Sequence, residues 1–243
     1  MLSLSRKIIV NTVLYNEHDS IVTFLNNLSR IRDIWAVEIL DGSWRKEKKS
    51  SVNSTDDTKK LVNKWIRDNS VPFEVCFTES KQIWKTQSAK RNSLLDLTQK
   101  KYGDCWIFVL DADEAIKFPN GFEAITLEPY LRDQTKCGVL KTYQYNSNDV
   151  LPSIRLIPTG HEIHYHTELS KMLHDTNCNI LMDYNPTRIF QSWDTFDFND
   201  MFIVNYLALQ KGTRQLKKFP HHIDKKNQLK DVECKWKQLY VQI

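Results

Sequence analysis

Three carboxylates follow a strongly apolar run in the middle of the chain. Trp106 to Leu110 are five large apolar residues in succession, and Asp111, Asp113 and Glu114 come directly after them. Side chains alternate along an extended segment, so Asp111 and Asp113 are expected on the same side, with the small Ala112 between them. Two carboxylates on one side suit manganese or magnesium, which complete their shells with water and substrate phosphates. The pattern therefore predicts a divalent-cation site whose natural partner is a diphosphate.

An Asp-x-Asp pair also has ordinary explanations. Acidic residues at the end of a strand are often a solvated turn or the first residues of a helix, so the pair alone is weak evidence for a metal. An EF-hand calcium loop is excluded, because Ile116 stands where that loop requires glycine.

Basic residues precede the apolar run. Residues 87–98 are expected to form a helix that carries Lys90, Arg91 and Asn92 near its start. Because a helix N-terminus attracts anions and basic side chains add to that attraction, we expect this helix to face phosphate.

A group of histidines follows later in the chain. His161, His164 and His166 lie near Glu162 and Glu168. Zinc ligation is one interpretation, but the spacing fits no single helical face and alternates only in part as a strand. Surface or substrate-lining imidazoles are the favoured interpretation.

These side chains need a frame that brings them together. Runs of β-branched and apolar residues predict strands at 7–14, 35–40, 73–77, 106–110, 137–145 and 154–157. Helical spacing of apolar residues predicts helices at 21–28 and 61–66, in addition to 87–98. Asn16 is expected to cap the first helix, and Asp41 ends the second strand. The alternation favours an α/β fold with an open, mostly parallel sheet flanked by helices.

Between the second strand and the second helix lies a charged, aperiodic stretch, Trp44 to Asn53. It has neither an apolar period nor turn chemistry, so we expect a mobile loop that tolerates change in length. Ser54 to Asp57 then restarts regular structure as a helix cap.

The last part of the chain suggests further helices. Apolar residues between Phe198 and Leu209, and between Leu229 and Leu239, recur at helical spacing. Nine Lys or Arg against three acidic residues occupy Lys211 to Lys237. Such a run usually forms a solvated helix face; the alternative is peripheral contact with an anionic membrane, and no specific nucleic acid is expected.

Composition is that of a globular protein. The 243 residues are 41% hydrophobic and 26% charged, with a formal net charge of +4. No stretch approaches the roughly 20 apolar residues of a membrane span, and a cytoplasmic location is expected. The five cysteines are odd in number and form no Cys-x-x-Cys pair, so reduced thiols are expected rather than disulfides or zinc.

The order of the motifs resembles family 2 glycosyltransferases of the GT-A fold, including the lipopolysaccharide-core and peptide glycosyltransferases. The resemblance rests on Tyr15-Asn16-Glu17, on Ala89-Lys90-Arg91-Asn92 and on Leu110 to Glu114. The family's Asp-Gly-x-Ser-x-Asp-x-Thr segment is split here into Asp41 to Ser43 and Ser54 to Thr58, with the charged loop between. The resemblance covers residues 1–175 as the nucleotide-sugar-binding and catalytic domain. Residues 176–243 are expected to form a mainly helical extension packed on it.

The resemblance implies roles for particular residues. Asn16, Glu17 and Asp41 would line the base and ribose of a nucleotide, Arg91 the diphosphate side, and Asp113 the metal. Asn92 and Asp111 are also expected to bind the substrate, and Asp111 is expected to share the metal with Asp113. Relatives carry a Val-His-Glu segment after a tyrosine, but counting from Tyr165 places Leu169-Ser170-Lys171 there. Glu168 is therefore the candidate general base, and His166 is its strongest rival.

The resemblance implies an inverting, hexosyltransferase-like reaction. A sugar would pass from a nucleotide-diphosphate donor to a hydroxyl or similar nucleophile on a glycan, a lipid-linked acceptor or a peptide. Two alternatives stay open: a non-catalytic nucleotide-sugar or glycan-binding module, and, with less support, a nucleotidyltransferase, which would usually have a Gly-rich turn after its first strand. A dehydrogenase is weaker still, because the chain has six glycines and no G-x-G-x-x-G fingerprint.

Overall fold

The computed structural model describes the N-terminal two thirds of the chain almost continuously and the rest in segments. The described residues are 7–44, 51–117, 127, 131, 137–143, 150–159, 163–166, 179–182 and 195–204.

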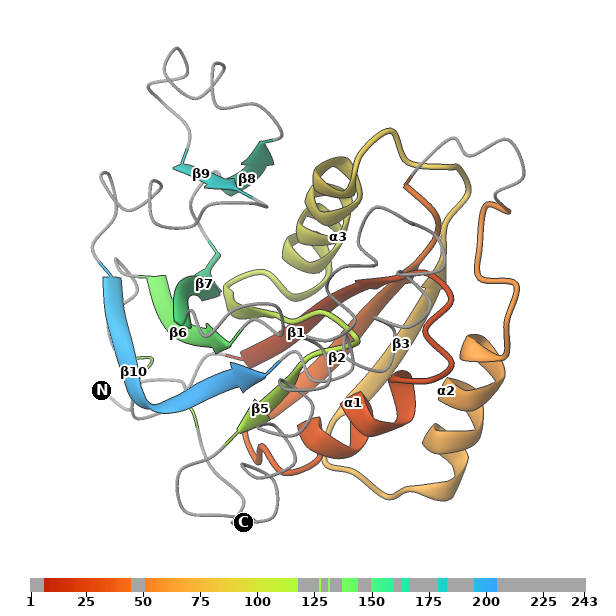
Figure 1. Cartoon of the computed structure of the whole chain (residues 1–243), viewed down its shortest axis with the longest axis horizontal. Helices are drawn as coiled ribbons and strands as arrows, with labels where there is room; N and C mark the ends of the chain where they lie inside the picture. The colour runs from red at the N-terminus through yellow and green to blue at the C-terminus, as the bar shows by residue number, and fades with distance from the viewer. Residues whose placement is uncertain are drawn as a thin grey trace, which may run out of the picture.

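An eight-stranded sheet forms the centre of the molecule, in the order β3-β2-β1-β4-β7-β6-β10-β5 (Figure 1). One half is parallel and consists of β1 (Lys7–Leu14), β2 (Ile34–Asp41), β3 (Glu74–Glu79) and β4 (Cys105–Val109). The other half is mixed and consists of β5 (Ala115–Lys117), β6 (Cys137–Tyr143), β7 (Val150–Pro158) and β10 (Thr195–Val204). A separate parallel pair joins β8 (Ile163–His166) to β9 (Asn179–Met182).

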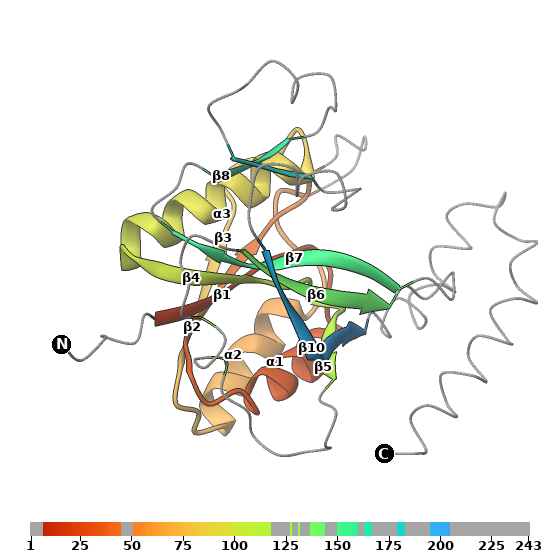
Figure 2. The same ribbon diagram turned by 90° about the vertical axis from the view of Figure 1, so that its left-hand side faces the viewer.

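Helices cover both faces of the parallel half. On one face lie α1 (Ile21–Leu28) and α2 (Thr58–Asp68), and on the other lies α3 (Gln87–Tyr102), as Figures 1 and 2 show. Every residue of β4 is buried, as expected for a central strand between helical layers. The α/β class with an open, mostly parallel sheet flanked by helices is thus confirmed.

The larger core fills the space between the sheet and the first two helices. Phe24 and Leu25 of α1 and Trp65 of α2 pack there against Val10 and Phe108 of the sheet. A smaller apolar layer under α3 contains Leu94 and Leu95.

Polar contacts also join α3 to the sheet. Asn11, Glu38 and Cys76 stand side by side on β1, β2 and β3. Above them, Thr98 donates to Asn11 at 2.9 Å, and Lys101 donates to Glu38 at 2.8 Å and to the Cys76 sulfur at 3.1 Å. Tyr102 also donates to Glu38, at 2.5 Å. The row fixes where α3 lies along the strands.

Two expectations about local structure are wrong. The helix expected from Phe198 onward is strand β10 through Val204, where pairing with β6 and β5 takes precedence over the helical spacing of its apolar residues. Asn16 does not cap α1, because that helix begins after Ser20.

Other expectations fall partly outside the described residues. These include most of the charged loop, residues 205–243 with their expected helices and basic run, and Glu168. In the described part of the chain, neither Cys76 nor Cys105 belongs to a disulfide. Within the described part of the chain, no helix has the length and apolarity needed to cross a membrane.

Candidate functional site

Three predicted site segments meet at one edge of the parallel half-sheet. Asn16 follows β1, Asp41 is the last residue of β2, and Asp111 comes two residues after β4. Because these strands are parallel, their carboxyl ends lie at the same edge, where α/β sheets bind ligands.

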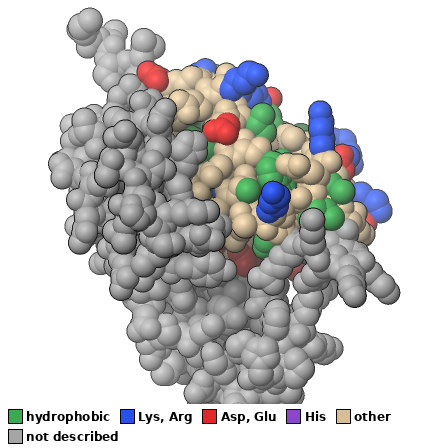
Figure 3. Space-filling model, turned by 90° about the horizontal axis from the view of Figure 1, so that it is seen from above, with side chains coloured by type: hydrophobic (Ala, Val, Ile, Leu, Met, Phe, Trp, Pro, Cys, Tyr) green, Lys and Arg blue, Asp and Glu red, His purple; other side chains and the backbone are tan. Residues whose placement is uncertain are grey.

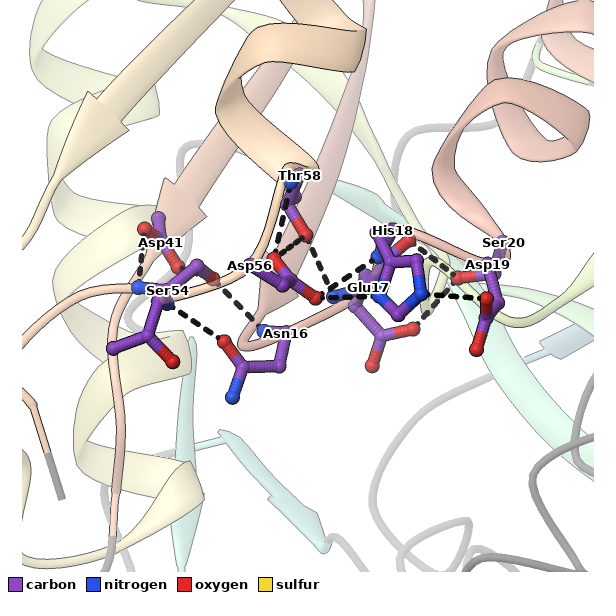
Figure 4. Close-up of polar contacts among 10 residues, drawn as sticks. Asn16, Glu17, His18, Asp19, Ser20, Asp41, Ser54, Asp56 and Thr58 are labelled. Carbon is purple, nitrogen blue, oxygen red and sulfur yellow. Dashed lines mark hydrogen bonds and ion pairs between the residues drawn. The ribbon is translucent and has the colours of Figure 1, made fainter. Parts of the chain in front are cut away.

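Ser54 joins the two halves of the split motif. Its hydroxyl donates to Asp41 Oδ1 at 2.6 Å, and its amide donates to Asp41 Oδ2 at 2.9 Å. The same hydroxyl accepts from the amide of Asn16 at 2.8 Å (Figure 4). Segments separated by the charged loop in the sequence are therefore contiguous in space.

Asp41 is a buried anchor of this site. Its side chain and backbone are 1% exposed, and Ser54 occupies both carboxylate oxygens. Burial raises the pKa of Asp41, while the two bonds from Ser54 and the charge of Lys90 oppose the rise. Asp41 thus holds the segment at Ser54 in place, and a ligand would contact the residues around Asp41 and not Asp41 itself.

Asn16 adopts a left-handed backbone conformation, with φ of 57°. Asparagine tolerates this region better than most residues. Its side-chain oxygen accepts from the amide of Thr55 at 2.8 Å, and no described residue accepts from its Nδ2. In Figure 4 this nitrogen points away from the network, so it is a donor that a ligand can use.

A second set of contacts fixes the turn after Asn16. The amide of Glu17 donates to Thr58 Oγ1 at 2.8 Å, and the hydroxyl of Ser20 donates to Glu17 Oε2 at 2.6 Å. His18 lies between two carboxylates, with Nδ1 2.9 Å from Asp56 and Nε2 2.8 Å from Asp19 (Figure 4).

Asp56 also supports the start of α2. It accepts from the amide and the hydroxyl of Thr58, at 3.0 and 2.5 Å. Partial burial would raise the pKa of Asp56, but the hydrogen bonds from Thr58 and His18 lower it below its usual value.

The charged loop is closed at its base. The amide of Ser43 donates to the carbonyl of Val52, and its hydroxyl donates to the carbonyl of Ser51, both at 2.9 Å. The insertion therefore leaves and rejoins the fold at neighbouring points.

The start of α3 differs from the expectation in one respect. Thr86 caps the helix by accepting from the amide of Ala89 at 3.1 Å. Lys90 does not face a phosphate site, because it is fully buried and turned towards the ends of β1 and β2.

Arg91 faces the acidic turn. Its Nη2 donates to Asp111 Oδ1 at 2.7 Å, and its guanidinium lies 5.6 Å from the centre of the Tyr165 ring. Arg91 is 11% and Asp111 30% exposed in the side chain, so the pair is partly open to a ligand.

Asn92 is used for structure. Its side-chain amide donates to the carbonyl of Tyr165 at 3.0 Å and accepts from the Tyr165 amide at 2.6 Å. Asn92 thereby fastens β8 to α3. His166 is the last residue of β8 and so lies on a strand attached to the site, but the side chain of His166 is not among those described.

Residues 111–114 form a turn and not an extended strand. The amide of Glu114 donates to the carbonyl of Asp111 at 2.9 Å, and Glu114 Oε2 accepts from the Asp111 amide at 2.9 Å. The alternation expected for Asp111 and Asp113 therefore does not apply. Glu114 is buried, and Arg155 binds both its carboxylate oxygens.

Asp113 is the acid of this turn that has no cationic partner among the described residues. Arg91 pairs with Asp111 and Arg155 pairs with Glu114, whereas no described side chain makes an ion pair with Asp113. Loss of solvation, followed by the charges of Asp111 and Glu114, raises the pKa of Asp113 to about 7.

The donor set suits a hard divalent cation that brings its own shell. In the described residues no three His, Cys, Asp or Glu side chains cluster to hold a metal. The protein would therefore supply Asp113 and, on exchange with Arg91, Asp111. Magnesium and manganese accept one or two carboxylates plus water and phosphates, so the residues fit.

Sequence reasoning missed several residues that build the site. Nothing in the local sequence pattern singles out Arg155, and Ser54 is predicted only as part of a helix cap and of the split motif, without its contacts to Asp41 and Asn16. Lys90 was assigned to phosphate, although it lies four residues before the buried Leu94 and so on the same helical face. That spacing was the signal that could have placed it inside.

Comparisons with known proteins give limited likenesses. No protein-family model and no curated protein matches the chain. Among solved structures, Staphylococcus aureus TarS 1-349 in complex with UDP-GlcNAc is 21% identical with a TM-score of 0.34, covering 46% of this chain and 28% of that one. The mannosyltransferase PcManGT from Pyrobaculum calidifontis, in complex with GDP-Man and Mn2+, is 18% identical with a TM-score of 0.42, covering 60% and 38%. The chain thus spans less than two fifths of either protein. Likenesses of this extent do not determine its activity, which has to be derived from its own residues.

Proposed function

We propose that the chain is a metal-dependent glycosyltransferase that moves a sugar from a nucleotide-diphosphate donor to an acceptor nucleophile with inversion. The observation that carries the proposal is the contact of Ser54 with both Asn16 and Asp41. Through this contact the two halves of the split motif lie together at the sheet edge where Asp111 also lies, which supports a donor site there.

The described residues support a division of labour. Asn16 offers Nδ2 to the base or ribose, and the Glu17 turn is held in place by Thr58. Arg91 has terminal nitrogens close to the turn and would meet the diphosphate. Asp113 would hold the cation, which when bound stabilises negative charge on the departing diphosphate.

The acceptor side would be supplied by the segment after β7. Removal of a proton from the acceptor hydroxyl requires a base on the face opposite the leaving group. Glu168 remains our candidate and His166 its rival. The acceptor would be a glycan, a lipid-linked molecule or a peptide.

Membrane contact and location are separate proposals. The basic stretch Lys211 to Lys237 could attract an anionic membrane surface and so bring the enzyme to a lipid-linked acceptor. On the face of the described residues that Figure 3 shows, basic side chains are interspersed with acidic ones and form no single patch. We propose a cytoplasmic enzyme.

A non-catalytic binding module is the second candidate. It is favoured by one observation, the presence of Leu169-Ser170-Lys171 where relatives carry an acid. Such a module would bind the donor and leave it intact.

A thermal-shift screen of nucleoside diphosphates with and without manganese tests donor binding. We expect stabilisation by uridine or guanosine diphosphate that requires manganese and is lost in Asp113→Asn. Equal stabilisation in a chelator would contradict the metal site. Release of diphosphate from a nucleotide sugar only when acceptor is added would separate an enzyme from a binding module.

A further inference from the structure

Lys90 carries a charge that is closed off from solvent. It is 0% exposed, and its Nζ donates to the carbonyl of Leu14 at 2.7 Å and to that of Gly42 at 2.5 Å. The ring of Trp44 lies 5.5 Å from the same nitrogen. An ammonium has three N–H donors, so two carbonyls and one aromatic face account for all of them.

The two carbonyls belong to the segments that carry the donor site. Leu14 ends β1, two residues before Asn16, and Gly42 follows Asp41 at the end of β2. Lys90 itself lies in the first turn of α3, next to Arg91. One side chain therefore ties together the three elements from which the site is built.

Stability alone does not account for a lysine here. Burial lowers the pKa of Lys90 to about 7, with Arg91 adding to the fall and Asp41 and Asp111 opposing it. A buried ammonium thus costs folding free energy, and groups of this kind concentrate at functional sites.

We propose that Lys90 is a positioning residue for nucleotide binding, whose ammonium holds the carboxyl ends of β1 and β2 in the arrangement that the donor requires. The inference rests on the proposed function and adds a residue to it. Lys90 does not touch the nucleotide, since no part of it reaches solvent. It acts through the backbone carbonyls of Leu14 and Gly42. The charged groups that face its ammonium are Asp41 on β2, Arg91 on α3 and Asp111 after β4.

The proposal makes nucleotide affinity depend on the proton of Lys90. Protonated Lys90 can satisfy both carbonyls and the Trp44 ring, whereas the neutral amine has two donors and no charge. Binding should favour the protonated form, and by linkage the nucleotide should favour protonation of Lys90.

The test compares the nucleotide affinity of three proteins: the wild type, Lys90→Met and Lys100→Met. Lys100 lies on the same helix but is exposed, so its variant is a matched control. Dissociation constants of uridine and guanosine diphosphate are measured with manganese between pH 6 and 8.5. Titration of the diphosphate and of Asp113 affects all three proteins, so the ratio of variant to wild type isolates Lys90.

We expect Lys90→Met to weaken binding about tenfold or more at pH 6, as for loss of a charged hydrogen bond, and the ratio to fall towards one at pH 8.5. Lys100→Met should bind like the wild type. A ratio of one throughout, or a loss independent of pH, overturns the positioning role and leaves the proposed function standing. A wild type that binds neither nucleotide overturns both.

A second measurement does not need the variant to fold. In wild-type protein with 13C-labelled lysine, the titration midpoint of the Lys90 Cε signal should move to higher pH when nucleotide is added. An unchanged midpoint in a sample saturated with nucleotide contradicts the proposal.

Discussion

Arg155 on β7 binds the buried Glu114 through both terminal nitrogens, at 2.9 and 2.7 Å. Glu114 in turn accepts from the amide of Asp111. A strand from the mixed half of the sheet therefore fixes the acidic turn that follows the parallel half, and Glu114 is unavailable to a metal.

Removal of Arg155 should destabilise the fold. Arg155→Met leaves the Glu114 carboxylate buried without its partner, which typically costs about 3–5 kcal/mol. Urea denaturation measures the loss. Adding Glu114→Gln should restore part of it, and Lys59→Met, which breaks the exposed pair with Glu79, should cost less than about 1 kcal/mol. A double variant no more stable than Arg155→Met would show that the guanidinium acts through other contacts.

Ser54→Ala should separate the two halves of the donor motif. The change removes the hydroxyl that bonds both Asp41 and Asn16, so we expect a loss of about 1–3 kcal/mol in unfolding free energy and weaker nucleotide binding. Calorimetric titration and chemical denaturation give the two quantities. Ser29→Ala, which removes an exposed serine bond to Asn26, is the control. Unchanged nucleotide affinity in Ser54→Ala would mean that the motif halves are positioned independently.

The stability of the ligand-free protein should rise with pH through the range set by Lys90. Its pKa is about 7 when folded and 10.5 as a free side chain. Between these values the unfolded chain holds more protons, so the free energy of unfolding increases with pH; the cost of burial is fully present below pH 7. Denaturation curves from pH 7 to 9.5 should show a steeper rise for the wild type than for Lys90→Met. If the free energy of unfolding rises equally with pH in both proteins, a group other than Lys90 accounts for the rise.

The charged loop should tolerate shortening if its base is kept. Replacing residues 45–50 by two glycines retains Trp44, Ser51 and Val52, and hence the bonds to Ser43. We expect unfolding free energy to change by less than about 1 kcal/mol, since loops that carry few buried contacts contribute little. Ser43→Ala in the full-length chain tests the base separately. A loss of several kcal/mol on shortening would show that the loop is packed.

The catalytic base can be identified by kinetics. Glu168→Gln should keep donor affinity and lower transfer by two or more orders of magnitude, in line with general-base contributions of roughly 10²–10⁴. Steady-state rates with saturating donor measure the effect, and Glu162→Gln serves as the control. If His166→Ala removes transfer and Glu168→Gln does not, the histidine is the base.

Much of the frame could be predicted from sequence because local signals and burial agree there. The run Lys7 to Leu14 and the apolar spacing of Ile21, Phe24, Leu25 and Leu28 predict β1 and α1 with the bounds observed. The segment after Phe198 could not be predicted, since its partners β6 and β5 are distant in sequence and pairing decided its structure.

The candidate site, like the frame, was predictable where local signals were enough and not where contacts between distant segments decide the structure. Spacing after a buried strand placed Asp41 and Asp111 at one sheet edge, which needs only the parallel order of the strands. The partners of those acids, Ser54 and Arg91, became evident only from the fold. The pairing of Glu114 with Arg155 spans 41 residues, and no periodicity encodes a contact of that kind.

The hydrogen bonds from Thr98 and Lys101 to the strands under α3 also determine where the start of this helix lies. A helix held by apolar side chains alone could slide along a sheet at little cost, because such contacts have no direction. Thr98 and Lys101 bond to Asn11 and Glu38, and these bonds are lost if the helix slips by a turn. Arg91 lies seven residues before Thr98, which is about 10 Å along the axis. The hydrogen bonds at the C-terminal end of α3 therefore fix how close the Arg91 guanidinium at its N-terminal end lies to Asp111.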